Sequence, residues 1–144
     1  MIDQTAIHKM TLNSNSRERG DAVRKIGVNF AVLPDKDQAW DDVSRLLEDE
    51  NGSVRHWAAE TIGIAFSYIP DKENAWKCLI ILSGDDNENV RYTATRALGR
   101  SFPHAFDKYL AWNDLHELTS ENADIHVLMG VAEALGWAFP HIPN

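Results

Sequence analysis

A block of about 36 residues repeats along the whole chain, and this period restricts the fold more than any other feature of the sequence. Glycines recur at Gly27, Gly63, Gly99 and Gly136, and tryptophans recur in another phase at Trp40, Trp76 and Trp112. Apolar residues keep a constant phase at Ile26, Ile62, Leu98 and Leu135 and at Phe30, Phe66, Phe102 and Phe139. A fixed period of this size is typical of a solenoid, in which each unit buries its apolar face only against its neighbours.

Each unit has the pattern of two helices joined by a polar turn. Within residues 37–72, apolar side chains spaced three and four apart predict one helix in 37–47 and a second in 54–69. Pro70 ends the second helix, and Asp71 is expected to cap the following one through its side-chain oxygen. We therefore expect one all-α domain over residues 1–144, with units at 1–36, 37–72, 73–108 and 109–144.

The first unit departs from this pattern, because Gln4 stands where the other units have tryptophan. A degenerate end unit is typical of a capping repeat, although residues 1–14 also fit a frayed terminus. The tryptophans are expected to pack in the core. Each recurrent glycine falls inside a helix, where it costs about 1 kcal/mol relative to alanine, so we expect another helix to approach closely there.

Composition and charge argue against several classes of function. The chain has 144 residues and a net charge of −8, whereas general binding to nucleic acid or anionic lipid needs a clustered positive field. No apolar run is long enough to span a membrane, and the N-terminus has no apolar stretch of the signal-peptide type. The single cysteine, Cys78, cannot form an internal disulfide. We expect a cytoplasmic protein without a nucleic-acid or membrane partner.

Two segments resemble HEAT repeats of the short, HEAT-like type: NGSVRHWAAETIGIAF at 51–66 and NENVRYTATRALGRSF at 87–102. The Val-Arg pair, the small residues after it and the Leu/Ile-Gly step match in phase, and the resemblance covers residues 15–144. It implies a right-handed α-α superhelix, a HEAT-like solenoid of about four two-helix repeats. Such a solenoid most often serves as a binding scaffold, but the fold alone implies no particular activity.

The resemblance also implies a hydrogen-bonded ladder between units, formed by an aspartate of the turn and the arginine after the valine. The matching residues are Asp49 with Arg55 and Asp85 with Arg91. The first unit keeps Arg19 but has Asn13 in place of the aspartate. In the fourth unit Leu128 replaces the arginine and one residue is inserted in the turn, so we expect the ladder to weaken toward the C-terminal end.

The second helix of each unit should line the concave side of the superhelix, as in the family. The side of these helices opposite the apolar residues forms columns across the units, one of which is Arg24, Glu60, Arg96 and Glu133. The candidate partner-binding residues on this face are His56, Glu60, Tyr92, Arg96, Arg100, Met129, Glu133 and Trp137. Arginine and aromatic residues are enriched in binding hot spots, so we expect a protein or peptide partner here. Two other interpretations stay open: the alternating charges fit a salt-bridge ladder between units, and the aromatic residues fit partial burial against a neighbouring unit.

No metal site, cofactor or catalytic centre is expected. His104 and His141 occupy equivalent positions in adjacent units, but no cysteine pair or His-Glu-x-x-His helix accompanies them. Deoxyhypusine hydroxylase, a HEAT-like enzyme, holds iron with His-Glu dyads, whereas His56 here precedes Trp57. HEAT-like alkylpurine glycosylases bind DNA in a basic groove, which the acidic residues of this face oppose. Phycobilin lyase subunits share the repeat type, but nothing in this sequence marks a pigment pocket. Cys78 is expected to pack rather than react.

These observations favour a non-catalytic interaction module, so we expect that the chain is not an enzyme. Two other functions stay open: an enzyme subunit or fragment that uses this scaffold, and a purely architectural role in a longer solenoid. Pro140 and Pro143 either close the array or precede another helix. In the second case the last unit would expose an apolar face and favour self-association through the end repeats.

Overall fold

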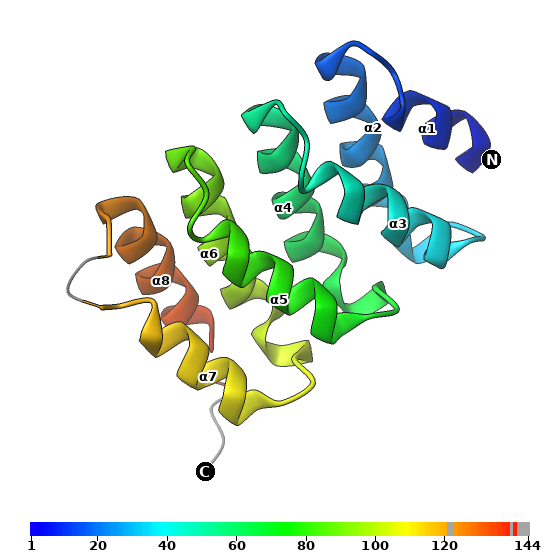
Figure 1. The fold of residues 1–144 in the computed structure, drawn as a ribbon. Helices are drawn as coiled ribbons and strands as arrows, with labels where there is room; N and C mark the ends of the chain where they lie inside the picture. The colour runs from blue at the N-terminus through cyan, green and yellow to red at the C-terminus, as the bar shows by residue number, and fades with distance from the viewer. Residues whose placement is uncertain (121–122, 139, 141–144) are drawn as a thin grey trace.

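The computed structural model describes residues 1–120, 123–138 and 140, and every regular element in these ranges is helical (Figure 1). The α-helices are α1 (Gln4–Thr11), α2 (Ser16–Asn29), α3 (Lys36–Leu46), α4 (Gly52–Ala65), α5 (Lys72–Leu82), α6 (Glu88–Ser101), α7 (Lys108–Glu117) and α8 (Ile125–Ala138). Short 3-10 helices follow three of them: η1 (Phe30–Val32), η2 (Phe66–Tyr68) and η3 (Phe102–His104). The predicted HEAT-like solenoid of two-helix repeats is confirmed.

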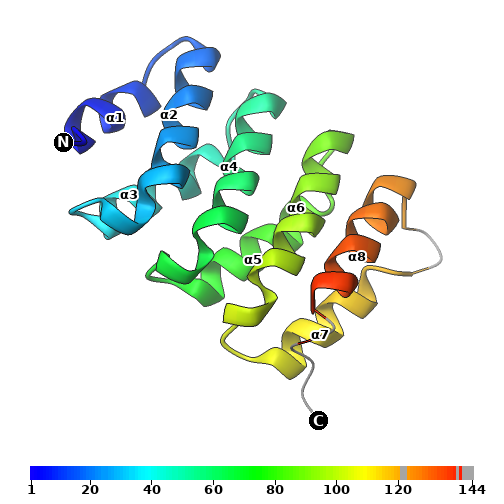
Figure 2. The same ribbon diagram turned by 180° about the vertical axis from the view of Figure 1, so that it is seen from behind.

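The helices lie in two layers (Figures 1 and 2). The first-helix layer contains α1, α3, α5 and α7, and the second-helix layer contains α2, α4, α6 and α8. Successive helices of the second layer pack directly side by side. The prediction for residues 37–72 differs in two details, since α4 begins at Gly52, inside the expected turn, and ends at Ala65, where a 3-10 helix takes over.

Capping side chains set the helix starts at the period of the repeat. An aspartate precedes each first helix and accepts a hydrogen bond from a backbone amide of the first turn: Asp3, Asp35, Asp71 and Asp107. An asparagine plays the same part for three second helices: Asn15, Asn51 and Asn87. Each such cap contributes about 1 kcal/mol. The capping role predicted for Asp71 is confirmed, and the asparagine caps are an addition that the structure supplies.

The core lies between the two layers and consists of the repeat columns. Phe30, Phe66 and Phe102 are at most 1% exposed, and Phe139 lies outside the described residues. Trp40 and Trp76 are buried, which confirms their predicted core role, whereas Trp112 is half-buried in the last first-layer helix. The side chains of each column contact those of the adjacent units, so one apolar core continues along the stack of units.

Three of the recurrent glycines lie where the next second-layer helix comes closest. A Cβ atom on Gly63 would stand 3.1 Å from the Cβ of Ala97, and one on Gly99 would overlap the backbone of α8. A Cβ on Gly27 would be similarly crowded by α4. The predicted close approach of another helix is therefore confirmed at these three positions. Gly136 has open space within 4 Å of the equivalent point, because it lies on the last described helix.

The first unit is a packed end repeat. Gln4, which replaces tryptophan, exchanges two hydrogen bonds with the backbone of Asp35, at 2.6 and 3.0 Å. His8 Nδ1 lies 2.9 Å from Asp42 Oδ1, and the buried Thr11 hydroxyl reaches the same carboxylate at 3.2 Å. These contacts favour a capping repeat over a frayed terminus.

Candidate partner-binding surface

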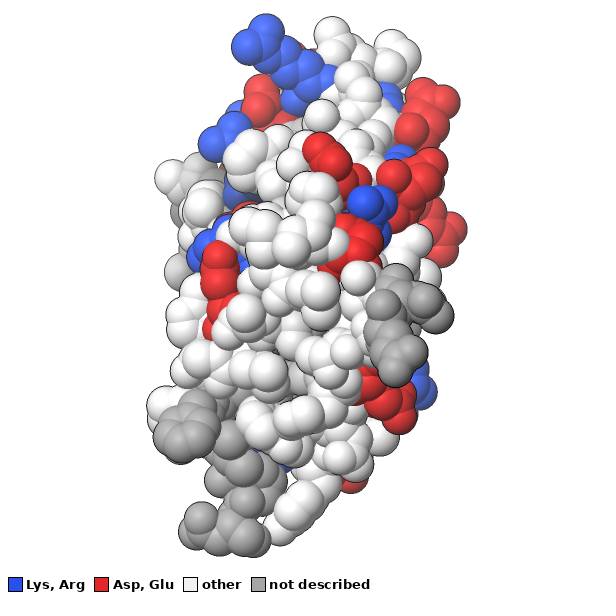
Figure 3. All heavy atoms as spheres, turned by 90° about the vertical axis from the view of Figure 1, so that its left-hand side faces the viewer, with Lys and Arg blue, Asp and Glu red and all other residues white. Residues whose placement is uncertain are grey.

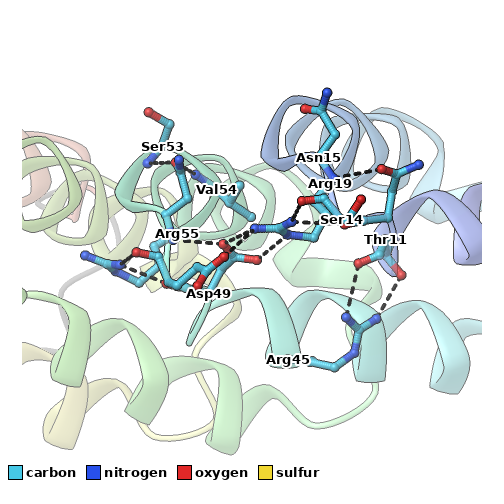
Figure 4. A network of polar contacts seen from close by, with 12 residues as sticks. Thr11, Ser14, Asn15, Arg19, Arg45, Asp49, Ser53, Val54 and Arg55 are labelled. Atoms are coloured by element: carbon cyan, nitrogen blue, oxygen red, sulfur yellow. Dashed lines mark hydrogen bonds and ion pairs between the residues drawn. The ribbon is translucent and has the colours of Figure 1, made fainter.

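A ladder of arginines and aspartates joins the turns of successive units (Figure 4). Arg19 Nε donates to Asp49 Oδ2 at 2.7 Å, and Arg55 Nε donates to Asp85 Oδ2 at 2.9 Å, so each arginine reaches the turn of the following unit. The same guanidinium groups also donate to carbonyl oxygens of their own turns, as Arg55 Nη1 does to Asp49 at 2.8 Å. The ladder therefore fixes the register in which the second-layer helices stack.

The insertion in the fourth unit does not remove the next rung of the ladder. Arg91 Nε donates to Asp124 Oδ2 at 2.6 Å, and Arg91 Nη1 donates to the carbonyl of Asp85 at 2.8 Å. The expected weakening does not reach Arg91, because Asp124 accepts its hydrogen bond from the position that the capping Asn51 and Asn87 occupy in the preceding units. Leu128 then ends the series, since it occupies the next arginine position.

The ladder lowers the pKa of its own aspartates. Burial alone would raise the pKa of Asp49, but hydrogen bonds from Arg19 and from the Asn51 amide outweigh burial and lower it. The pKa of Asp85 is lowered for the same reasons, with Arg55 as the donor. Both carboxylates are therefore ionised over a wider pH range than a solvent-exposed aspartate.

The predicted binding residues lie on one surface, the second-helix face, which consists of side chains of α2, α4, α6 and α8 that point away from the first-helix layer. Six of the eight form a connected set, here called the arginine–aromatic cluster: Glu60, Tyr92, Arg96, Arg100, Glu133 and Trp137. These six residues come from three successive units, so the stacking of the units assembles the cluster.

Two arginines connect the cluster through ion pairs. Arg96 Nε donates to Glu133 Oε2 at 2.8 Å, and Arg100 Nη1 donates to Glu60 Oε1 at 2.8 Å. The Tyr92 hydroxyl donates to the other oxygen of Glu133. This hydrogen bond raises the pKa of Tyr92 and is the main cause that lowers the pKa of Glu133. The two arginines and two glutamates balance, so the cluster as a whole is neutral at pH 7.

Aromatic rings complete the cluster. The Arg96 guanidinium carbon lies 5.3 Å from the centroid of the Tyr92 ring and 5.7 Å from that of Trp137, and the Arg100 carbon lies 5.2 Å from Trp137. Cation–π contacts at this distance contribute about 0.5–1 kcal/mol at exposed sites. Trp137 stays 38% exposed in this arrangement.

The remaining predictions for this face are only partly matched. In the column of Arg24, Glu60, Arg96 and Glu133, the expected ion pair between Arg96 and Glu133 forms. Glu60 instead pairs with Arg100, which belongs to the neighbouring column. Arg24 lies 4.3 Å from the ring centroid of Trp57 and 3.7 Å from Asp21, because the nearby indole offers a flat surface to the guanidinium.

Two of the eight candidates stand apart from the cluster. His56 Nδ1 lies 2.8 Å from the Thr93 hydroxyl, so its ring is engaged within the stack rather than turned to the cluster. Met129 is 50% exposed on α8.

An exposed apolar row extends the surface toward the first unit. Val28, Val32, Ile64 and Tyr68 are between 49% and 72% exposed. Their positions belong to the columns that contain Arg100, Trp137 and His104, but the prediction did not include them among the binding residues. The signal that could have found them is the presence of large apolar side chains in these columns, at Val28 and Ile64 on α2 and α4 and at Val32 and Tyr68 on the 3-10 helices that follow.

The end of the array at α8 carries few charges. Among its 14 residues α8 has one acidic side chain, Glu133, and neither lysine nor arginine. Ile125, Leu128 and Met129 are exposed on it. Figure 3, which views the molecule from this side, shows charged side chains mainly in the upper part and uncharged residues over most of the lower part.

Other chemistry has little support in the described residues. His104 is described, but the equivalent His141 is not, and the described part of the chain contains no group of three or more potential metal ligands. Cys78 is partly buried and packs against the core, and burial raises the pKa of its thiol. Among the described helices, none is both long and apolar enough to cross a membrane.

Comparisons with known proteins show the fold. No family model matches the chain, and no curated protein matches it. The complex of CpcE and CpcF of phycocyanin lyase from Nostoc sp. PCC7120 matches with a TM-score of 0.70 and 21% identity, over 91% of this chain and 85% of that one. Crystal structures of two engineered proteins match with TM-scores of 0.67 and 0.66 at 19% and 20% identity, over 95% of this chain. The chain spans 62% and 64% of their lengths. The fold is thus that of a HEAT-like helical-repeat protein.

The likeness to the phycocyanin lyase complex corrects one prediction. The sequence led us to expect that the chain is not an enzyme, because motifs of catalysis are missing from it. A protein of similar fold forms part of a lyase complex, so a helical-repeat scaffold without such motifs is compatible with a role in an enzyme. The expectation of a chain without enzymatic function is therefore withdrawn.

Proposed function

We propose that this chain is a helical-repeat scaffold, related to the repeats of phycobilin lyase subunits, that binds a protein or peptide on its concave second-helix face. The observation that carries the proposal is the continuity of the arginine–aromatic cluster with the exposed apolar row. Together they span all four units, whereas most soluble proteins scatter their exposed apolar residues singly.

The chemistry of the surface indicates what kind of segment would fit. The cluster is neutral and its charges are paired, so association there would depend on contact with the exposed Trp137 and the arginine planes. The row at Val28 and Ile64 would receive apolar side chains. An extended or helical segment with apolar residues along one side matches both parts. A cytoplasmic location remains a prediction that accompanies this proposal.

The experiment is a capture from lysate of the source organism with the native chain and with a Tyr92→Ala, Arg96→Ala variant, read by mass spectrometry. Both substitutions remove cluster side chains that are at most partly buried, so the fold should persist. We expect a protein that the native chain retains and the double variant loses. Asp41→Ala on the exposed side of α3 is the matched control and should retain the same protein.

Equal capture by the native chain and the double variant would contradict the proposed surface. Circular dichroism of each variant separates this result from unfolding. Loss of the protein by the α3 control as well would show that capture does not depend specifically on the second-helix face.

A second candidate function is a subunit of an enzyme, and the similarity to the CpcE–CpcF complex favours it. On this proposal the captured partner is another helical-repeat chain, and the two act together. The test is to assay the reconstituted pair for lyase activity. An inactive pair, or a partner of another fold, would count against this candidate and leave the scaffold proposal in place.

A further inference from the structure

A separate recess lies in the first-helix layer, between α5 and α7, away from the second-helix face. Its volume is about 530 Å³, within the range of roughly 300–1,000 Å³ that is usual for small-molecule sites. Its apolar lining includes the following side chains: Trp76, Ile80, Ile81, Ala105, Phe106 and Leu110.

The repeat itself provides an internal reference for this lining. The residues one unit earlier are Ser44 for Ile80, Arg45 for Ile81, Pro70 for Phe106 and Asn74 for Leu110. Four positions that are polar or proline in the preceding unit are therefore large and apolar here, and all four border the same recess. Ile80 also packs against the core, but packing between units does not account for the other three, because Ile81, Phe106 and Leu110 are 74%, 85% and 56% exposed.

One smaller residue opens the recess. Leu33 and Ile69, which precede the starts of α3 and α5, are at most 1% exposed and fill the core at these junctions. The equivalent residue before α7 is Ala105, which is only partly buried and lines the recess. The side-chain volume that Ala105 lacks, compared with Leu33 and Ile69, leaves a space beneath the first turn of α7. A compact molecule fits such a space better than a helix laid along the groove.

The charges around the recess already have partners. Lys77 Nζ pairs with Glu73 at 2.9 Å, and Lys72 Nζ donates to the Ile69 carbonyl at 3.1 Å. The two aspartates accept hydrogen bonds from neighbours in the same way: Asp107 from the Leu110 amide at 3.0 Å and Asp114 from Trp76 Nε1 at 2.8 Å. All five charged side chains of the lining thus have a partner within the chain, and the surface between them is apolar, which favours a ligand without charge.

We propose that the recess between α5 and α7 binds a small, uncharged, apolar molecule, which contacts Trp76 and Phe106 and occupies the space that Ala105 leaves. This site is independent of the proposed function of the second-helix face. Binding there would place a ligand on the opposite layer from the proposed protein partner.

The test is a fluorescence titration of the full chain with N-phenyl-1-naphthylamine, an uncharged aromatic molecule. We expect saturable binding of one molecule per chain. Ala105→Ile restores the residue of the preceding unit and fills the recess, so it should weaken binding at least tenfold. Leu12→Ser, which removes an exposed apolar side chain away from the recess and from the second-helix face, is the control and should leave the affinity unchanged.

Equal binding by the native chain and Ala105→Ile would overturn the proposal. Absence of saturable binding to the native chain would also overturn it and would leave a partner helix as the occupant. If Ala105→Ile does not fold, Phe106→Pro is the second variant. It places at the rim of the recess the proline that the preceding unit has at this position, and it should weaken binding by itself. A shift of the Trp76 indole N–H resonance on binding, with the Trp40 resonance unmoved, would locate the molecule in the recess.

Discussion

At the scale of single residues, the arginine in the first turn of α2, α4 and α6 connects two units. Arg55 donates to the carbonyls of Asp49 and Glu50 in its own turn and to the carboxylates of Asp85 and Asp86 in the next. Its side chain is 15% exposed and that of Asp85 is 9% exposed. Ion pairs that are buried to this extent are poorly screened by solvent, so their loss lowers the stability of the fold more than the loss of a surface ion pair does.

Replacing Arg55 should destabilise the chain. Arg55→Ala leaves the partly buried Asp85 carboxylate without its main donor and two turn carbonyls unpaired, and we expect the free energy of unfolding to fall by about 2–3 kcal/mol. Urea denaturation followed by circular dichroism measures this. Lys77→Ala, which removes an exposed pair within α5, should leave the denaturation midpoint nearly unchanged. Similar losses in both variants would show that the ladder has no special role.

The ladder also predicts how stability depends on pH. The pKa values of Asp49 and Asp85 are lower in the folded chain than in the unfolded one. Their contribution is therefore complete above the ordinary aspartate pKa of about 4 and is lost as the pH falls through the lower folded values. We expect the urea midpoint to drop below about pH 4. Asp49→Asn should be less stable at pH 7 and show a shallower decline; an equally steep decline would assign the effect to other carboxylates.

At the scale of helices, the second layer is tighter than the first because small residues lie at the contacts between its helices. Gly63 faces Ala97, and Gly99 faces Ala134, each on the next helix. The glycine at this place weakens its own helix, and the close approach of the neighbour offsets the loss. The aspartate and asparagine caps then set where the two helices of a unit begin, as Asp35 and Asn51 do for α3 and α4.

The same alanine substitution should have opposite effects at two glycines of this column. Gly99→Ala would push a Cβ into the backbone of Ala134, so we expect a loss of about 1–3 kcal/mol. Gly136→Ala meets no atom within 4 Å and should gain up to about 0.5 kcal/mol from helix propensity. Thermal unfolding of both variants checks this. A loss of equal size at Gly136 would mean that the glycines serve the helix itself rather than the contact between helices.

The sequence was sufficient for some elements and not for others. The period of the glycine and phenylalanine columns predicted the two-helix unit, because each column is a buried stripe that recurs in every unit. It could not predict that Glu60 pairs with Arg100 instead of Arg96, since both arginines are within reach of α4 and side-chain geometry decides between them. Asp124 was also missed, because it occupies the position of the capping Asn51 and Asn87 rather than the position of Asp49 and Asp85.

At the scale of the whole molecule, the array presents three surfaces of different character. The second-helix face combines a neutral cluster with an apolar row, and the first-helix layer holds the recess between α5 and α7. The α8 end has few charges (Figure 3). The net charge of −8 opposes close contact between copies in general. With one acidic side chain among its 14 residues, α8 contributes little to this repulsion.

We expect the chain to self-associate weakly through α8. Ile125 and Leu128 are 62% and 38% exposed there, and Leu128 occupies a position that is arginine in three other units. Leu128→Arg restores this charge and should keep the chain monomeric. Light scattering across a concentration series compares the two proteins. A native chain that stays monomeric at the highest concentration would rule out this contact.

The central claim is that a protein partner occupies the second-helix face, and site-specific photo-crosslinking tests it most directly. A benzophenone amino acid is placed at Tyr68, which is 49% exposed in the apolar row, or at Asp41 on α3 as the control. Illumination in lysate of the source organism should give a discrete protein adduct from position 68 and none from position 41. Equal adducts from both positions, or an adduct from position 41 alone, would contradict the account.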